Sequence, residues 1–538
     1  MSAPDDTGTL LVCADTVHTM TDGSVGPTAV LVEGGRIAAL GSREELTRRV
    51  GADAEVVDLG PGCVTPGLVD AHIHPIHGLE LARGADLSAV TSLEELRAAL
   101  AEESARTPEG WVLGYRLDPR VVAGRNPAAG DIDPVVPDRP ALVRLFDAHS
   151  AVVNTVALER CGITGREVFG STARVDVGPD GRPTGFLIEW EAMALALDAV
   201  PPPPLEARVD GLLALLGAMA DSGLTAGQVL DYTPGMIEVL EAAEAREDLP
   251  IRLLLSPWIQ AGDAEGRVEE VIALQGRRGR RWHVDGVKLM IDGTIDNGSA
   301  WLERPDVNGE STRPLWLDPA EYTHVLHRLS GLGIRTTTHA IGDAGVRHVA
   351  ESIATAPNPA GVTHRVEHIE TAPDDTLALF GAHGIAASMQ PTHCTLYCSA
   401  DGSDNWSQRL GDDRVDRAWR LRSLRDLGVP VATGSDWPVA PFEPLRIMAD
   451  AQLRREAGRP DQPPIVPAEA LTARQALEGY TSDRADSFDD RELGRIRVGA
   501  PADLSLFAAD LLATPPDDLP SVEVVATVVG GRVRVVSR

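Results

Sequence analysis

Residues 67–75 read GLVDAHIHP, and this stretch decides the fold. Residues 67–74 are typical of a short buried β-strand, and the proline at position 75 ends it. His72 and His74 are two positions apart, so on a strand both side chains point to the same face. Imidazole is a common metal ligand, although an isolated His-x-His pair is a weak signal on its own.

Seven further β-rich runs follow at spacings that leave room for a helix between most neighbours. Strands that alternate with helices in this way are typical of a parallel β/α barrel. The eight strands are predicted at 67–74, 223–230, 251–257, 283–291, 334–339, 363–368, 385–390 and 429–436.

The two ends of the chain are rich in short strands and Gly-Gly hairpins, as in EGGRIAAL and VGGRVRVV. We therefore expect a composite β-sandwich built from residues 1–66 plus 491–538. Residues 67–490 are predicted to form the (β/α)8 TIM-like barrel. The gap between the first two strands is too long for one helix, so the barrel must carry an insertion at about 91–204. The predicted fold class is α/β.

Four more chemically distinctive residues lie toward the carboxyl ends of predicted barrel strands: Lys288, His339, His368 and Asp436. Barrel enzymes build their active sites at this end of the strands. With the histidine pair, the sequence thus places four histidines, a carboxylate and a lysine at one barrel mouth. This convergence predicts a metal-binding catalytic site.

Lys288 is the only lysine among 49 basic side chains. Burial lowers the pKa of a lysine, and the neutral amine can add carbon dioxide to become a carbamate that bridges two metal ions. Arginine stays protonated and cannot do this, which explains why a chain so rich in arginine keeps one lysine. The alternative role is a structural ion pair with Asp292, but that role gives no reason to exclude arginine.

Composition excludes several classes of function. The formal net charge of −31 and the pI of about 4.8 disfavour binding to nucleic acid or an anionic membrane surface. No stretch approaches the roughly 18 apolar residues of a membrane span. Five scattered cysteines argue against a disulfide framework. The acidic N-terminus does not resemble a signal peptide, so we expect a cytoplasmic location.

The motifs VTPGLVDAHIHP, VDGVKLMIDGT, THAIGD, RVEHIE and GSDWPV resemble those of the amidohydrolase superfamily. The similarity is to its family 3 branch, which includes N-substituted formamide deformylases, and it runs nearly end to end. These motifs are specific for the superfamily and fairly specific for the branch, but not for a substrate.

The resemblance implies a zinc site with one or two ions per chain. His72, His74 and Asp436 would hold the first ion, His339 and His368 the second, and carboxylated Lys288 would bridge them. A metal-bridging hydroxide would attack the amide of a small molecule, one candidate being an N-substituted formamide. Asp436 would act as general base and then as general acid. A homodimer is a further expectation from the family.

Other residues receive secondary roles. Substrate-binding candidates are His149, His393, Trp190, Trp301 and Trp437, each of which could instead be structural. Asp343 and Asp292 are candidates for orienting the ligands from behind. Two alternative functions stay open: another reaction at the same dizinc site, such as ester or lactone hydrolysis or isomerisation, and a non-catalytic binding protein that has kept the fold.

Overall fold

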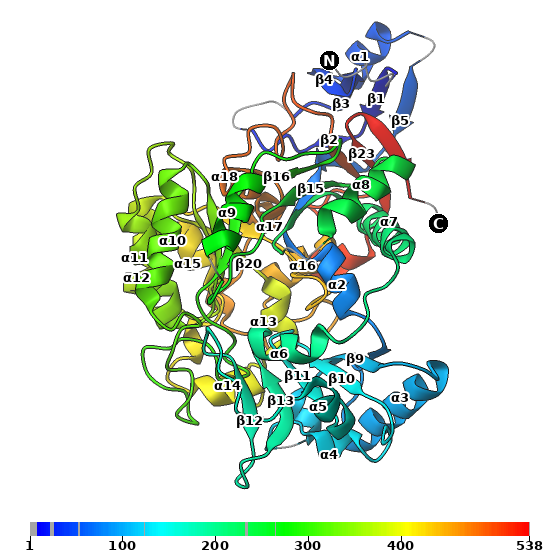
Figure 1. Ribbon diagram of the computed structural model, residues 1–538. Helices are drawn as coiled ribbons and strands as arrows, with labels where there is room; N and C mark the ends of the chain where they lie inside the picture. The colour runs from blue at the N-terminus through cyan, green and yellow to red at the C-terminus, as the bar shows by residue number, and fades with distance from the viewer. Residues whose placement is uncertain are drawn as a thin grey trace.

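The computed structural model describes residues 8–21, 26–51, 54–122, 124–231, 235–263 and 265–536. Three layers of structure are stacked along its long axis: sheets from the two chain ends, a central region of parallel strands, and a sheet from the insertion (Figure 1). Within the described residues, no helix has the length and apolar character needed to cross a membrane.

The central region consists of two parallel sheets. The first has the order β16-β15-β14-β7, formed by β7 (Leu68–Ile73), β14 (Leu224–Val229), β15 (Arg252–Leu255) and β16 (Trp282–Val284). The second has the order β17-β18-β19-β20-β21, formed by β17 (Val287–Met290), β18 (Thr336–Ala340), β19 (Arg365–His368), β20 (Ala386–Met389) and β21 (Val431–Thr433). This arrangement confirms the α/β class.

The sequence predicted one continuous closed barrel, but the described residues form two separate parallel sheets instead. The predicted strand 283–291 is divided into β16 and β17 because Gly286 adopts a positive φ of 86° between them. At the other seam, the Ser435 amide donates to the side chain of Asp70 (3.0 Å). The only strand pairing across the two seams within the described residues consists of isolated parallel bridges, Trp258 with Lys288 and Ile73 with Trp437.

Amphipathic helices cover these sheets. In α11 (Asp343–Thr355), Val346, Val349, Ala350 and Ile353 recur at helical spacing and are buried. The other helices between and after the strands are α7 (Leu205–Asp221), α8 (Met236–Arg246), α9 (Glu265–Leu274), α10 (Pro319–Gly331), α12 (Asp374–His383), α15 (Leu421–Asp426), α16 (Pro444–Leu453), α17 (Ala473–Tyr480) and α18 (Ser482–Asp486). Shorter helices follow individual strands: α2 (Pro75–Leu81), α13 (Pro391–Tyr397) and α14 (Asn405–Leu410).

The insertion forms its own six-stranded sheet at one end of the molecule (Figure 1). Its strands are β8 (Ala85–Asp86), β9 (Val112–Leu117), β10 (Ala141–Leu145), β11 (Ser150–Val153), β12 (Arg174–Val177) and β13 (Pro183–Ile188). Its helices are α3 (Leu93–Arg106), α4 (Ala129–Ile132), α5 (Thr155–Cys161) and α6 (Trp190–Leu197). The start of β11 contacts the segment that follows β17, where Ser150 Oγ donates to Asn297 Oδ1 at 3.1 Å.

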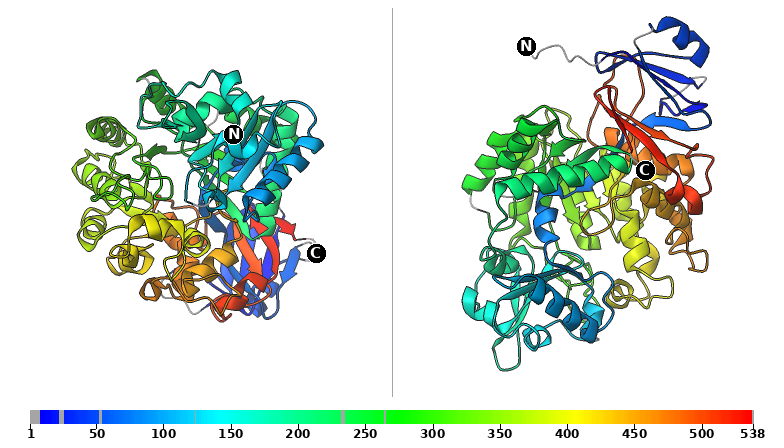
Figure 2. Two further views of the ribbon diagram at one scale, coloured as in Figure 1. Left: turned by 90° about the horizontal axis from the view of Figure 1, so that it is seen from below. Right: turned by 90° about the vertical axis from the view of Figure 1, so that its right-hand side faces the viewer.

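Strands from both chain ends lie together at the opposite end of the molecule (Figure 2). One sheet comes from the N-terminal segment alone and contains β1 (Leu10–Cys13), β3 (Ala29–Glu33), β4 (Arg36–Gly41) and β5 (Glu55–Asp58). The other combines both ends and contains β2 (Thr16–Val17), β6 (Cys63–Pro66), β22 (Leu504–Phe507), β23 (Val524–Val529) and β24 (Arg532–Val535). The two sheets share one apolar cluster, which includes Val12, Val30, Leu504 and Val528. The sandwich arrangement and the domain boundaries stay predictions.

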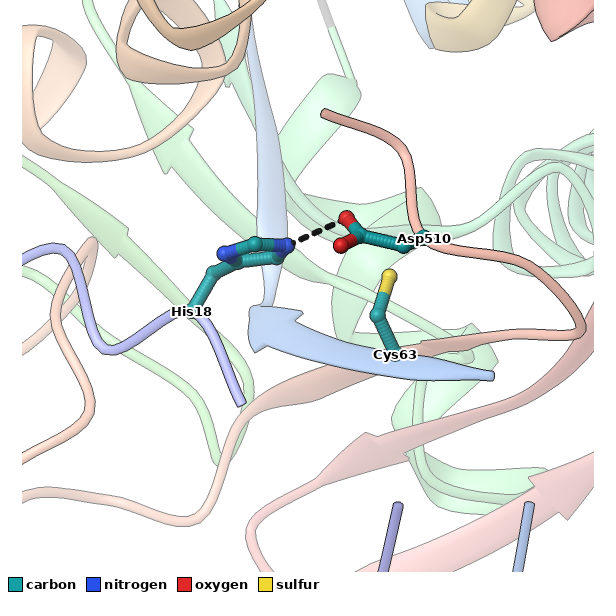
Figure 3. A group of neighbouring side chains, drawn as sticks. All are labelled: His18, Cys63 and Asp510. Atoms are coloured by element: carbon teal, nitrogen blue, oxygen red, sulfur yellow. Dashed lines mark hydrogen bonds and ion pairs between the residues drawn. The ribbon is translucent and has the colours of Figure 1, made fainter. Parts of the chain in front are cut away.

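A polar contact also joins the two ends. His18 Nε2 lies 2.7 Å from Asp510 Oδ1, beside the buried Cys63 (Figure 3). Burial raises the pKa of the Cys63 thiol to about 12, so the thiol is neutral at physiological pH. We interpret this group as a structural tie between the N-terminal and C-terminal segments.

Candidate metal-dependent active site

The structure brings the six predicted ligands to one cavity. His72 lies in β7, Lys288 in β17 and His339 in β18, while His368 ends β19 and Asp436 follows β21. His74 directly follows β7. All six line the same cavity at the carboxyl ends of the parallel strands. The cavity is therefore where a barrel-type active site is expected.

Asp436 is the centre of this group. Its Oδ1 lies 3.0 Å from His74 Nε2 and 3.5 Å from His72 Nε2. Its Oδ2 lies 3.9 Å from His368 Nδ1 and 3.9 Å from His393 Nε2. Asp436 and His368 also have positive φ angles of 57° and 70°, which non-glycine residues rarely adopt. Such backbone strain is often found at functional sites.

The two histidines of the His-x-His pair are each held from behind by a buried carboxylate. His72 Nδ1 contacts Glu367 Oε2 at 2.9 Å, and His74 Nδ1 contacts Asp231 Oδ2 at 2.9 Å. Because Nδ1 is engaged in both rings, Nε2 is the nitrogen turned toward Asp436. Metal-binding histidines are oriented by carboxylates in this way.

These supporting residues were not predicted from the sequence. Asp231 lies just after β14, and Gln390, which accepts from His368 Nδ1 at 2.8 Å, lies just after β20. Both could have been found by the strand-end rule that found the ligands. Glu367 precedes His368 in β19. Its contact with His72, which is distant in sequence, could be found only from the fold.

Lys288 is 2% exposed, and its Nζ lies 3.5 Å from His72 Nε2. Burial lowers the pKa of Lys288 to about 8, although the carboxylates of Glu367 and Asp436 oppose this shift. A substantial fraction of the amine is therefore neutral in mildly alkaline solution. Asp292, the alternative ion-pair partner, instead accepts backbone N–H groups of Trp301 (2.8 Å), Ile341 (3.0 Å) and Gly342 (2.8 Å).

Two groups of side chains here could hold a metal ion, each with its ligand atoms within 4.8 Å of one another. The first contains His72, His74 and Asp436. The second contains His368, His393 and Asp436, whereas the prediction paired His368 with His339, whose ring lies 4.5 Å from that of His368. His339 lies in the same cavity, with Nε2 3.2 Å from the Gly293 carbonyl and 3.8 Å from Asp292 Oδ1. The donor set of imidazoles and carboxylate suits zinc.

Some of the predicted substrate-binding and ligand-orienting residues line the cavity, and others do not. His149 and Trp190 line the cavity, and His149 Nδ1 contacts Glu189 Oε2 at 2.9 Å. Trp301 and Trp437 do not line it and pack against apolar clusters. Asp343 accepts the backbone N–H of Glu303 at 2.8 Å, and no hydrogen bond joins it to a predicted ligand within the described residues.

Two adjoining cavities border the ligands, each with a volume of about 40 Å³. What we term the first half-site is lined beyond the ligands by His77, Leu81, Trp190, Trp258, Met290 and Pro438. The second half-site is lined by Phe146, Thr294, Asp296, Ile341, Glu370, His393, Tyr397, Trp406 and Trp419. Asp147, His149, His339, His368, Asp436 and Val439 border both.

The two half-sites differ in chemistry. The first contains the neutral imidazole of His77, whose pKa burial lowers to about 3 and whose two nitrogens have no hydrogen-bond partner among the described residues. In the second, burial raises the pKa of Asp296 to about 7. Burial, followed by the nearby carboxyl of Asp296, raises the pKa of Glu370 well above its ordinary value.

The chain is similar in sequence to several known proteins. A sequence model described as "Amidohydrolase family" matches residues 55–535. YtcJ of Bacillus subtilis (strain 168), a putative amidohydrolase by name, is 28% identical over 96% of this chain and 97% of its own length. N-substituted formamide deformylase of Arthrobacter pascens is 26% identical over 94% of each chain.

Solved structures show the same fold. The crystal structure of an uncharacterized metal-dependent hydrolase from Pyrococcus horikoshii OT3 superposes with a TM-score of 0.74 at 22% sequence identity. The match covers 95% of this chain and 99% of that one.

Proposed function

We propose that this chain, which belongs to the amidohydrolase family and is therefore a hydrolase, cleaves a non-peptide C–N bond in a small amide at a divalent-metal site. One observation carries the proposal. His72 and His74 present carboxylate-anchored imidazoles to Asp436, beside a lysine whose pKa burial has lowered.

The side chains fit zinc at two positions. His72, His74 and Asp436 would hold one ion, while His368 with His339 or His393 would hold the second. When bound, such ions lower the pKa of a water molecule and polarise a substrate carbonyl. Substituting His339 and His393 separately, and measuring bound zinc in each variant, distinguishes the contributions of these two histidines.

Lys288 would complete the site after carboxylation. The neutral amine attacks carbon dioxide, an N–C bond forms, and one amine proton leaves to solvent. The product carries its carboxylate on Nζ, which lies 3.5 Å from His72 Nε2. The burial of Lys288 favours this reaction because burial disfavours the ammonium form.

Asp436 is suited to move the proton. Burial raises its pKa, but the hydrogen bond and charge of His74 outweigh burial and hold the pKa below its ordinary value. Asp436 is thus a carboxylate at neutral pH, and it borders both half-sites. It would accept the proton of the attacking water and deliver it to the leaving nitrogen, which an amide requires because its unprotonated nitrogen leaves poorly.

The two half-sites would receive the two substituents of the amide. The similarity to N-substituted formamide deformylase makes formamides the first substrates to examine. His149, Trp190 and His77 are then placed to contact the substrate. We also propose that the two central sheets represent an interrupted (β/α)8 barrel and that the terminal sheets form a β-sandwich.

A substrate screen on zinc-loaded protein tests the reaction class. Formamides, N-acyl amines, cyclic amides and lactones are each incubated with the wild type and with Asp436→Asn. We expect amine release from at least one amide and little release by the variant. Turnover of lactones alone would reject C–N bond cleavage in favour of ester hydrolysis.

A further inference from the structure

Two carboxyl groups in the second half-site take no part in the proposed reaction. Glu370 is 8% exposed and lines the space, and its Oε2 accepts the indole N–H of Trp406 at 2.8 Å. No other hydrogen bond reaches this carboxyl group from the described residues, which leaves Oε1 free. Asp296 Oδ1 accepts from Asn405 Nδ2 at 2.8 Å, and its Oδ2 also has no partner among these residues.

A third acid at this place, Asp147, is already satisfied. It accepts from Thr294 Oγ1 at 2.8 Å, from the Asn297 side chain and from the His149 backbone at 3.1 Å. The imidazole of His149 also lies close enough to oppose the rise in pKa that burial causes in Asp147. The unmatched acidic groups are therefore Asp296 and Glu370.

Positive charge is scarce around them. Neither arginine nor lysine lines the second half-site in the part of the chain that the structure describes. Arg409 acts on Asp296 but is paired with Asp306 at 2.7 Å and Glu310 at 2.6 Å. Two buried carboxylates without a counter-charge are unfavourable, so the empty site favours their protonated forms, and a cationic ligand would stabilise their ionised forms.

The walls suit a cation as well. Trp406 and Trp419 are both nearly fully buried, and their rings lie 5.1 Å apart at 36°. Phe146 and Tyr397 form a second pair at 4.5 Å. Aromatic faces attract ammonium groups, and desolvation strengthens the attraction.

We infer that the second half-site binds a cationic ammonium group on one substituent of the substrate, with Glu370 and Asp296 as its partners. The inference rests on the proposed function, because it assigns the substituent of the amide that this function cleaves. The first half-site would then receive the uncharged substituent.

Matched substrates test the assignment. N-formyl-1,4-diaminobutane carries an ammonium group where N-formylpentylamine carries a methyl group and N-formyl-5-aminopentanoate a carboxylate. In a second series the varied group is on the acyl side: N-methyl-5-aminopentanamide carries an ammonium group where N-methylhexanamide carries a methyl group. In at least one series, kcat/KM should be at least tenfold higher for the ammonium compound than for its methyl counterpart.

The variants Glu370→Gln and Asp296→Asn remove one charge each and preserve side-chain size. The amide that Glu370→Gln introduces retains a carbonyl that accepts the Trp406 N–H, so folding should be preserved. In each variant the ammonium-to-methyl ratio of kcat/KM should fall at least tenfold. Glu238→Gln, on the exposed face of α8, removes an acid elsewhere and should leave this ratio unchanged.

Calorimetry separates this inference from the proposed reaction. Pentylamine, an ammonium ion at neutral pH, should bind the zinc-loaded wild type more tightly than the uncharged 1-pentanol, and Glu370→Gln should abolish the difference. If these two ligands behave as expected but no amide is hydrolysed, the proposed function fails and the cation site stands. Equal binding of pentylamine and 1-pentanol, or equal kcat/KM for the ammonium and methyl compounds in both series, would overturn the inference.

Discussion

Asp231→Asn tests whether the buried carboxylate behind His74 orients that histidine for metal binding. In the wild type, Asp231 Oδ2 lies 2.9 Å from His74 Nδ1. Burial lowers the pKa of His74, but hydrogen bonds to Asp231 and Asp436 outweigh burial and raise it to about 9. In the metal-free protein both ring nitrogens of His74 therefore carry protons at neutral pH. Zinc would displace the proton on Nε2, while Asp231 would keep the proton on Nδ1.

Asparagine keeps the shape but can present its NH2 group to Nδ1, which favours the opposite tautomer. Loss of such a supporting carboxylate typically weakens metal affinity 10- to 100-fold, or about 1.4–2.8 kcal/mol. We expect a loss of this size in zinc affinity, measured by competition with a chromophoric chelator. Activity should recover when zinc is added in excess.

Asp221→Asn is a control, because Asp221 also accepts a hydrogen bond from a basic side chain, that of Arg534 (2.7 Å), but belongs to none of the groups of described residues that could hold a metal ion. It should leave zinc affinity at the catalytic site unchanged. If Asp231→Asn bound zinc as tightly as the wild type, the orienting role of the carboxylate would be refuted.

Three further changes probe the proton relay and the lysine. Asp436→Asn should lower kcat on the order of a hundredfold or more, since general acid–base catalysis contributes about that much; near-normal turnover measured with saturating zinc would move the relay to another residue. Lys288→Arg should be inactive and hold less zinc by elemental analysis, because a guanidinium cannot be carboxylated; an active variant would show that the lysine is structural. Carbamate formation in metal-free wild type, followed by 13C NMR at constant dissolved carbon dioxide, should increase as pH rises through about 8, because the reactive amine is neutral above the pKa of Lys288. A signal that stayed constant from mildly acidic to mildly alkaline pH would contradict that assignment.

The residues at the strand ends could be predicted because a strand followed by a turn can be recognised from the local sequence pattern. His72, His74, Lys288, His339, His368 and Asp436 were all placed at one cavity in this way, and the structure brings them together. Their roles as ligands stay a prediction until metal is measured.

Long-range pairing could not be predicted in the same way. Glu367 is adjacent to His368 in sequence, yet it contacts His72, 295 positions away. Trp301 and Trp437 were expected at the substrate pocket, while Trp258, Trp406 and Trp419 line it instead. Aromatic residues carry no local pattern that separates a pocket wall from a core.

The predicted barrel strand 283–291 is interrupted at Gly286, which the apolar sequence pattern did not indicate. Both halves are apolar, so the run reads as one strand. Gly286 permits the positive φ that separates β16 from β17, and a Cβ at this position would lie 2.9 Å from the Arg335 side chain. A glycine inside an apolar run therefore signals an interruption in this chain.

Metal dependence is the central claim, and a zinc titration of chelator-treated protein tests it most directly. Hydrolysis of an amide identified in the substrate screen and bound zinc are measured on the same samples. We predict no hydrolysis without metal and a rise in activity that saturates at one to two zinc ions per chain. His72→Ala should bind less zinc and remain inactive. Full activity in metal-free wild type would contradict the account.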